Sequence, residues 1–448
     1  MRTIDVNVLL DEARFNAFHW RVLFWCALII VFDGYDLVIY GVVLPVLMQE
    51  WGLTPLQAGA LGSYALFGMM FGALFFGSLS DRIGRRKVIA CCVILFSLFT
   101  VLNGLARNPG EFAACRFIAG LGIGGVMPNV VALMNEYAPK RSRGLLVAIM
   151  FSGYSVGGML SAGLGIVLIP AFGWSSVFFV AVLPLLLLPL AMRQLPESVS
   201  FLLGSGGAEG RAGDLLHAVE PRYRPQPGDR FSIASGKVAS VGVSQLFHGK
   251  RTLCTLMLWM AFFCCLLMVY ALNSWLPKLM STAGYGLGSS LAFLLVLNLG
   301  AIIGAIAGGW LGDRFGLDRV LVAFFAMAAL AIALLGLKSP AAVLYLLVAL
   351  AGAGTIGTQI LANACAVQFY PAQVRSTGLG WAMGIGRTGA IIGPLLGGAL
   401  LAAQLPLALN FLVFAAPGAV AALAMMLFIH RRQALAGQAP LDASLPVQ

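Results

Sequence analysis

The chain has 448 residues, of which 60% are hydrophobic and 10% charged, and its mean hydropathy is +0.93. A soluble globule of this length would not be so apolar, so the composition predicts a helical membrane protein with many spans. Long apolar runs exclude a β-barrel, whose strands alternate over short segments. The net charge of +11 does not indicate nucleic acid as a partner, because the basic residues gather between the apolar runs.

The first apolar run carries two carboxylates, Asp33 and Asp36. An Asp at the centre of a span costs roughly 3 kcal/mol on insertion scales, so an acid there is a functional candidate by default. Their spacing places both on one helix face, and Tyr40 extends this polar face by a turn. Two acids close together where water is scarce are suited to holding a proton. The alternative is structural, with one Asp capping a broken helix or pairing with a fixed arginine.

Twelve membrane-spanning helices are predicted in the lipid bilayer, near residues 20–43, 58–79, 87–105, 113–135, 145–168, 172–194, 253–275, 289–311, 319–337, 341–365, 376–402 and 407–430. With both termini on the cytoplasmic side, 23 of the 28 Lys and Arg fall in cytoplasmic segments or at the cytoplasmic ends of spans. This asymmetry predicts that orientation, and the excess positive charge suits an anionic inner leaflet. No small-residue cleavage site follows the first run, so we expect a retained helix rather than a signal peptide.

Two loop patterns occur once in each half of the chain. Gly77–Lys87 is matched by 309–316, and Glu136–Gly144 is matched by 369–378. A parallel repeat of this length predicts two pseudo-symmetric six-helix bundles around a central path. Charged residues of these loops are expected to form ion-pair latches that set the balance between inward and outward states; they are Asp81, Arg82, Arg85, Arg86, Glu136, Arg143, Asp313 and Arg314.

The predicted domain order follows from where the composition changes. It comprises a cytoplasmic N-terminal segment (1–19), an N-terminal bundle (20–194), a cytoplasmic linker (195–250), a C-terminal bundle (251–430) and a cytoplasmic tail (431–448). The linker is rich in Gly, Pro and charge, which predicts a short helix near 214–219 but no folded domain.

The paired Gly-x-x-x-Asp-Arg-x-Gly loops, the twelve spans and the central linker resemble the major facilitator superfamily. The second copy departs from the motif after Gly316, at Leu317 and Asp318. Within the superfamily, Asp33-Gly34-Tyr35-Asp36 and Gly386-Arg387-Thr388-Gly389 resemble the aromatic acid:proton symporters, and the stretches 12–16 and 32–52 resemble bacterial benzoate permeases. The resemblance implies an inner-membrane symporter that imports an aromatic carboxylate, benzoate or a hydroxylated benzoate, with protons by alternating access.

Three side chains are candidates for proton coupling: Asp33, Asp36 and Arg116. Arg387 is the candidate for the substrate carboxylate, because glycines open room beside a planar fork of donors; the alternative is a permanent pair with a buried acid. Further polar or aromatic side chains in the spans either line the substrate path or satisfy helix backbone; they are Tyr40, Asn129, Tyr154, Asn273, Asn298, Gln359, Asn363 and Trp381.

The sequence leaves functions other than import open. A proton-coupled drug or metabolite exporter on the same fold is the alternative, although paired acids and Arg387 favour an anionic aryl substrate. An enzyme is not expected, because the spans hold no nucleophile–base set, and neither is a metal or a cofactor, since the eight cysteines lack ligand spacing. A receptor that binds an aromatic acid without moving it is a further alternative. A monomer is the expected oligomeric state.

Overall fold

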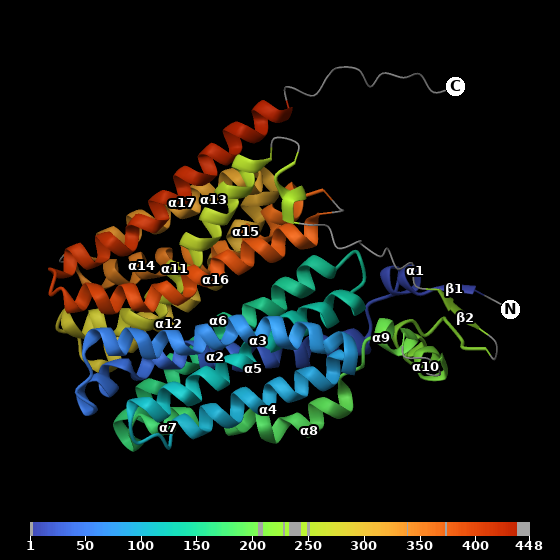
Figure 1. Ribbon diagram of the computed structural model, residues 1–448, viewed down its shortest axis with the longest axis horizontal. Coiled ribbons are helices and arrows are strands. Elements are labelled where there is room, and N and C mark those ends of the chain that lie inside the picture. Colours follow the sequence, from blue (N-terminus) through green and yellow to red (C-terminus); the bar gives the residue numbers. More distant parts are fainter. Residues whose placement is uncertain are drawn as a thin grey trace. The chain divides into compact units, whose positions relative to one another are not determined.

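The computed structural model describes residues 3–204, 209–226, 229–232, 243–248, 251–337, 339–371 and 374–436. Within these ranges, twelve helical segments are long and apolar enough to cross a membrane, and Figure 1 shows their arrangement. The predicted all-α, twelve-span architecture is therefore confirmed. Residues 437–448 of the predicted tail, and 205–208, 227–228, 233–242 and 249–250 of the predicted linker, lie outside the described residues.

The first six spans are α2 (Ala17–Glu50), α3 (Pro55–Ile83), α4 (Arg85–Asn103), α5 (Pro109–Tyr137), α6 (Arg143–Phe172) and α7 (Ser175–Phe179) with α8 (Val182–Gln194). The last six are α11 (Thr252–Thr282), α12 (Leu287–Phe315), α13 (Leu317–Leu334), α14 (Ala341–Gly352) with a π-helical turn (Ala353–Gly357) and α15 (Thr358–Phe369), α16 (Arg375–Ala402) and α17 (Leu407–Ala436). The contacts divide the chain into a first unit (Met1–Lys237 with Asn273–Leu295) and a second unit (Val238–Leu272 with Val296–Gln448).

Capping residues set where several spans begin. The Asn16 side chain accepts the Phe18 N–H at the start of α2. Thr54 and Gln57 form a reciprocal capping box at the start of α3, whose first residue is a proline. These side chains satisfy N–H groups that a helix leaves without an internal partner, so each span starts at a defined residue.

Glycines let two helix pairs of the first unit approach closely. A methyl group at Gly34 of α2 would lie 2.7 Å from the Tyr154 Cα of α6, and one at Gly124 of α5 would lie 2.7 Å from the Met69 Cα of α3. Both distances are too short for carbon atoms in contact, so only glycine fits. Small residues are the usual means of close packing between membrane helices. The crossing of α2 and α6 fixes the helix that carries Asp33 and Asp36.

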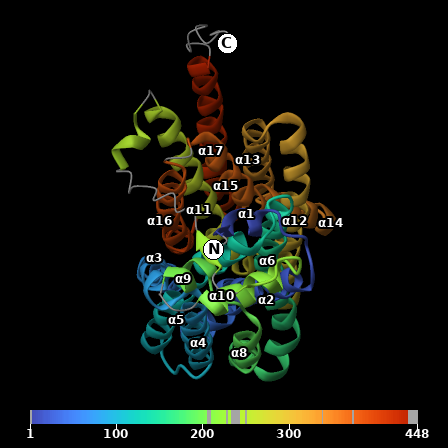
Figure 2. The ribbon, with the colours of Figure 1, turned by 90° about the vertical axis from the view of Figure 1, so that its right-hand side faces the viewer.

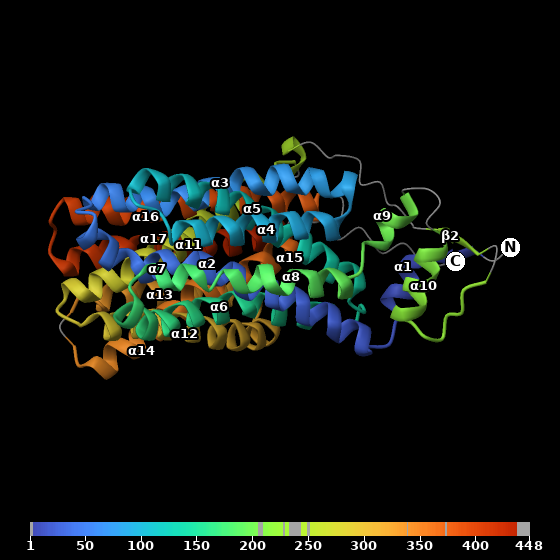
Figure 3. The same ribbon diagram turned by 90° about the horizontal axis from the view of Figure 1, so that it is seen from below.

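A small polar layer covers one end of the long helices of the first unit. It consists of β1 (Thr3–Asp5), α1 (Val6–Asp11), α9 (Val199–Gly204), α10 (Glu209–Val219) and β2 (Arg230–Ser232), and we call it the polar cap. Figure 3 shows it beyond the helix ends, and Figure 2 looks onto it. β1 and β2 pair in parallel, with Thr3 opposite Arg230. The sequence predicted only a short helix in the linker, so the strand pair and the packing of the N-terminal segment are additions.

Hydrogen bonds join the two sequence-distant parts of the polar cap. Asn16 Nδ2 donates to the Val219 carbonyl at the end of α10 over 2.8 Å. The Glu220 carboxylate accepts the backbone N–H of Arg14 over 3.0 Å and that of Arg222 over 3.2 Å. The pKa of Glu220 is lowered: partial burial alone would raise it, but the two N–H donors and the nearby guanidinium groups outweigh that effect. The N-terminal segment is therefore tied to α10 by a carboxylate.

Candidate functional site

A buried ion pair lies inside the first unit, between α2 and α5. Arg116 Nη1 of α5 is 3.3 Å from both Asp36 carboxylate oxygens, and its side chain is 1% exposed while that of Asp36 is 2% exposed. The same guanidinium also donates to the Asp36 backbone carbonyl, from Nη1 over 3.2 Å and from Nη2 over 3.3 Å. Arg116 thus holds Asp36 at two points, one that depends on the carboxylate and one that does not.

Thr100 of α4 is the third member of this site, and the sequence analysis did not single it out. Its hydroxyl donates to Asp36 Oδ1 over 2.5 Å, and its side chain is fully buried. A hydrogen bond to a charged acceptor is among the stronger ones that a protein makes. The signal that would have found it is a run of polar residues at three-residue spacing within an apolar span: Ser97, Thr100 and Asn103.

Asp33 lies one turn before Asp36 on α2 and is also fully buried. It is close enough to Cys92 of α4 to interact with it electrostatically. Gly34 between the two acids packs against the backbone at Tyr154 of α6, whose side chain is buried. Both acids therefore face the interior of the first unit. That arrangement satisfies the first requirement of a proton site, which is shelter from lipid and bulk water.

Aromatic rings close one end of this site. Phe112, one turn before Arg116 on α5, is surrounded by four rings from other segments, with centroid distances of 5.6 to 6.3 Å; they belong to Tyr40, Trp51, Trp174 and Phe178. The contacts with Trp51, Trp174 and Phe178 are edge-to-face, which is a favourable arrangement, and the Tyr40 ring is tilted by 46°. The Tyr40 hydroxyl, predicted to bind substrate, donates to the Ala58 carbonyl of α3. The Asp36–Arg116 pair is consequently sealed on this side.

The other predicted substrate side chains have varied surroundings. Asn129 donates to the Gly125 carbonyl of its own helix over 2.8 Å, which is the structural alternative that the sequence left open. Asn273 and Asn298 are buried, and Gln359 and Asn363 are half-buried after the π-helical turn. A π-helical turn inside a span often marks a functional site, and the sequence analysis did not predict it.

Arg387 and Trp381 lie on α16 in the second unit. Arg387 is half-buried and Trp381 is 45% exposed. The Trp381 ring stacks on Trp259 of α11, with centroids 5.9 Å apart and planes inclined by 22°. A stacked indole pair is a flat apolar surface of the kind that suits an aryl ring. Whether Arg387 binds substrate remains a prediction.

The predicted latch residues of the first unit form two separate ion pairs. Arg85 Nη1 is 2.7 Å from Glu136 Oε2, and Glu136 also accepts hydrogen bonds from Ser198 and Ser200 at the start of the polar cap. Arg143 Nη2 is 2.5 Å from Asp11 Oδ1 of α1, a partner that the sequence did not predict. The Arg86 backbone N–H donates to Glu197, whereas Asp81 and Arg82 are exposed. These contacts therefore join loops of the bundle to the polar cap, and their role as a latch stays a prediction.

Comparison with known proteins identifies the family. The sequence profile of the Major Facilitator Superfamily matches residues 26–308 and 296–444. The chain belongs to the major facilitator superfamily. It is 47% identical over 438 residues to the benzoate transport protein of Acinetobacter baylyi, covering 96% of this chain and 94% of that protein. It is 39% identical to the gentisate transporter of Corynebacterium glutamicum, covering 90% and 85% of the two chains. It is 36% identical to the 4-hydroxybenzoate transporter PcaK of Pseudomonas putida, covering 89% and 90%.

Solved structures agree on the superfamily fold. The xylose transporter XylE from Escherichia coli, in a partially occluded inward-open conformation, has a TM-score of 0.71 with 16% identity, covering 92% of this chain and all of that one. The superfamily and these relatives are transporters, so the prediction that the chain is not an enzyme is confirmed. Among the described residues, no group of three or more His, Cys, Asp or Glu is placed to hold a metal ion.

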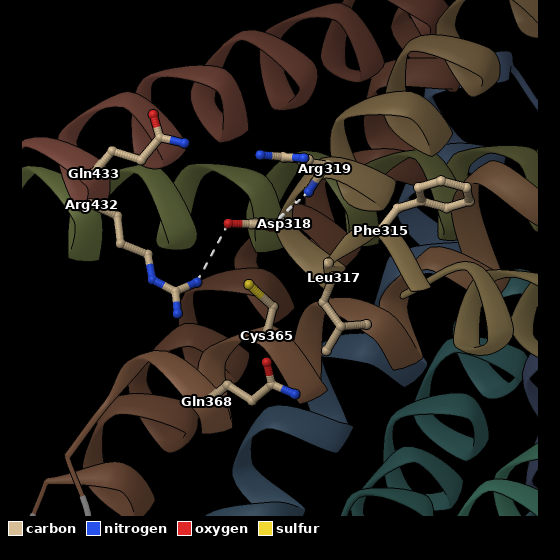
Figure 4. Close-up of a pocket in the computed structure, with 9 residues that line it drawn as sticks. Phe315, Leu317, Asp318, Arg319, Cys365, Gln368, Arg432 and Gln433 are labelled. Carbon is tan, nitrogen blue, oxygen red and sulfur yellow. Dashed lines mark hydrogen bonds and ion pairs between the residues drawn. The ribbon is translucent and has the colours of Figure 1, made fainter. Parts of the chain in front are cut away.

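The second copy of the superfamily loop motif has its own ion pair (Figure 4). Asp318, which stands where the first copy has a basic residue, lies 3.4 Å from Arg432 Nη1 of α17. The pair borders a cavity of about 480 Å³ that Arg319, Cys365 and Gln368 also line. Of the predicted latch residues here, Asp313 and Arg314 are exposed, and the Arg314 guanidinium lies over the Phe315 ring at 5.5 Å. The second loop thus replaces a basic motif with an acid–base pair to the last helix.

Proposed function

We propose that this transporter imports an aromatic carboxylate, benzoate or a hydroxylated benzoate, across the bacterial inner membrane together with protons. The observation that carries the proposal is the buried Asp36–Arg116–Thr100 site inside the first unit of a twelve-span transporter. The similarity to proteins named for benzoate, gentisate and 4-hydroxybenzoate transport supports the substrate class.

Electrical work explains why protons accompany such a substrate. A membrane that is negative inside opposes entry of an anion by about 2.3 kcal/mol per charge per 100 mV. One proton carried with each carboxylate cancels this term, so the pH gradient drives uptake. A second proton makes uptake electrogenic. Two buried acids, Asp33 and Asp36, provide places for one or two protons.

Proton binding is coupled to movement through the Asp36–Arg116 pair. When Asp36 takes up a proton, its carboxylate loses the charge that attracts Arg116, and the balance between outward and inward states changes. Arg387 holds the substrate carboxylate, and other predicted side chains line the path: Tyr154, Asn273, Asn298, Gln359 and Trp381. The ion pairs of Glu136 and Arg143 stabilise one of the two states.

Orientation follows from the basic residues. Both termini, and therefore the polar cap, face the cytoplasm, since most Lys and Arg lie on that side. In this orientation, the aromatic rings around Phe112 close the periplasmic end of the proton site. As a separate point, we propose that the transporter acts as a monomer.

The test is uptake of labelled benzoate into proteoliposomes under an imposed pH gradient, acid outside. We expect the wild type to accumulate benzoate. We expect no accumulation by Asp36→Asn, by Asp33→Asn or by the double variant. Sustained proton-driven uptake in the double variant would refute the role of the acids. Extrusion of drugs from energised cells without benzoate uptake would favour the exporter, and benzoate binding without movement would favour a receptor.

A further inference from the structure

A file of buried polar side chains runs along α4 within the membrane. Ser97, Thr100 and Asn103 are each fully buried. An apolar side chain at each position would serve equally well for a helix that only has to cross the membrane. Residues three apart on a helix are neighbours, so the three side chains follow one another around one side of α4. The middle one, Thr100, donates to Asp36.

Helix direction sets the level of each residue relative to α2. Short turns join α2 to α3 and α3 to α4, so α2 and α4 run the same way through the membrane. Thr100 meets Asp36, so Ser97, three residues earlier on α4, lies on the same side of Thr100 along the membrane as Asp33 lies of Asp36. Cys92, five residues before Ser97 on α4, is near enough to Asp33 for the two groups to interact electrostatically. Asn103 continues the file past Asp36 toward the rings around Phe112.

Several polar atoms on this file, and one on Arg116 of α5, lack a protein partner among the described residues. They are Ser97 Oγ, both polar atoms of the Asn103 amide, and Arg116 Nε. Burying such groups without a hydrogen bond costs free energy, and proteins normally satisfy them with ordered water. The atoms stand on both sides of Asp36, so water bound to them would adjoin the proton site.

We propose that α4 carries the positioning residues of the proton site: Thr100 orients the Asp36 carboxylate, and Ser97 and Asn103 bind buried water that links Asp36 to Asp33 and to the end of α4. A hydroxyl donates one hydrogen bond and accepts two, so Thr100 donates to the ionised carboxylate and accepts from the protonated one. A hydronium ion in this buried water gives its proton to an Asp36 carboxylate oxygen and becomes water, and the reverse step returns the proton to water. The proposal rests on the proposed function.

The electrostatic surroundings of Asp36 are simple enough to test this role. The helix of Asp36 itself carries Asp33, Tyr35 and Tyr40, all of them buried. Arg116 faces Asp36 from α5, Cys92 of α4 lies near Asp33, and Tyr154 of α6 packs beside Gly34. The stretches of α3 and α8 at membrane depth, 57–80 and 182–192, contain no Asp, Glu, Lys, Arg or His. A change in the proton affinity of the site on replacing Thr100 therefore reports the lost hydroxyl.

The primary experiment measures protonation without substrate. Infrared spectra of the purified protein, recorded against pH, contain a protonated carboxyl band that Asp36→Asn removes. In Thr100→Val we expect the pH midpoint of this band to rise by about one unit, because a hydrogen bond to the ionised form is lost. Thr100→Ser keeps the hydroxyl and stays within a few tenths of wild type. Thr358→Val, which removes a buried hydroxyl bonded to its own helix, leaves the midpoint in place. Thr100→Ala replaces Thr100→Val if the latter does not purify as a folded protein.

Transport assays then separate positioning from structure. Thr100→Val should lower proton-driven benzoate accumulation about tenfold while counterflow exchange changes less than twofold. Asn103→Leu and Ser97→Ala should slow proton-driven uptake at an unchanged infrared midpoint, since they remove bound water and leave the donor to Asp36. An unchanged midpoint in Thr100→Val, equal shifts in both Thr100 variants, or wild-type uptake in Asn103→Leu and Ser97→Ala would overturn the proposal. A shifted midpoint in a protein that moves no benzoate would refute the proposed function and leave the positioning role of Thr100 intact.

Discussion

Replacing Arg116 with Leu should destabilise the protein by more than the loss of its hydrogen bonds alone, because it leaves the buried Asp36 charge without a partner. The Asp36 carboxylate is 2% exposed and has Arg116 as its charged partner at 3.3 Å. Removing one member of a buried ion pair costs about 3–5 kcal/mol, because the remaining charge is left without compensation in a medium of low dielectric. Asp36→Asn should cost less, since Arg116 keeps its hydrogen bonds to the Asp36 carbonyl oxygen.

The double variant Asp36→Asn with Arg116→Leu distinguishes this reasoning from simple loss of packing. It buries neither charge, so it should be more stable than Arg116→Leu alone by about 1–3 kcal/mol, within the range of couplings between contacting residues. The assay is thermal unfolding in detergent micelles, where 1 kcal/mol corresponds to about 1 °C for a chain of this length. A double variant no more stable than Arg116→Leu would refute the explanation.

The Asp11–Arg143 pair provides a matched comparison. Its atoms are closer, at 2.5 Å, but its side chains are 35% and 32% exposed. Exposed pairs contribute about 1 kcal/mol or less, because water and salt screen the charges. Arg143→Leu should therefore lower the unfolding temperature far less than Arg116→Leu does. Equal losses of unfolding temperature in Arg143→Leu and Arg116→Leu would show that burial does not determine the free-energy cost of breaking an ion pair.

Three further predictions concern other parts of the first unit. Gly34→Ala should cost about 1–3 kcal/mol of stability by overpacking against α6. Gly163→Ala should unfold at the wild-type temperature, because its methyl group would lie at an ordinary contact distance of 3.9 Å from Leu295 Cδ1. Glu220 has a pKa below its ordinary value of 4.5, so its contribution to folding stability is complete above pH 4.5 and is lost as the pH falls through the lowered pKa. Glu220→Gln should reproduce this loss at pH 7, seen as faster hydrogen exchange of the Arg14 and Arg222 amides that Glu220 binds. Exchange at the wild-type rate would contradict this role of Glu220. Glu136→Gln, which removes the charge that pairs with Arg85, should slow transport more than it weakens benzoate binding, and a pure loss of affinity would contradict the latch.

The sequence predicted most of the fold because the membrane imposes strict rules. A span must be long and apolar with its backbone satisfied internally, so hydropathy alone placed all twelve. The sequence also marked Asp36 and Arg116 as candidate functional residues, because a charged side chain inside a membrane span is costly. Pairing with a fixed arginine was one of the alternatives for the first-span acids, and the structure shows that pairing for Asp36.

What the sequence did not predict depends on contacts between distant residues. Thr100 is an ordinary residue for a membrane helix, and only its position opposite Asp36, 64 residues earlier, makes it notable. Asp11 and Arg143 are 132 residues apart, and either could have had another partner. The strands of the polar cap have three residues each, too few for a periodic pattern. The Asn129 amide shows the converse, a plausible ligand that is bonded within its own helix.

The geometry of Arg116 suits a site that must release its proton as readily as it binds it. Because the guanidinium donates to the Asp36 carbonyl oxygen as well as to the carboxylate, protonation of Asp36 removes only part of its hydrogen bonding. Arg116 therefore stays beside Asp36 in both protonation states, and the charge does not have to be hydrated and buried again in each cycle. A pair held through the carboxylate alone would lose all its bonds on protonation, with a cost near that of breaking a buried ion pair. In the proposed mechanism, the second attachment therefore lowers the free energy that the pH gradient must supply to protonate and deprotonate Asp36.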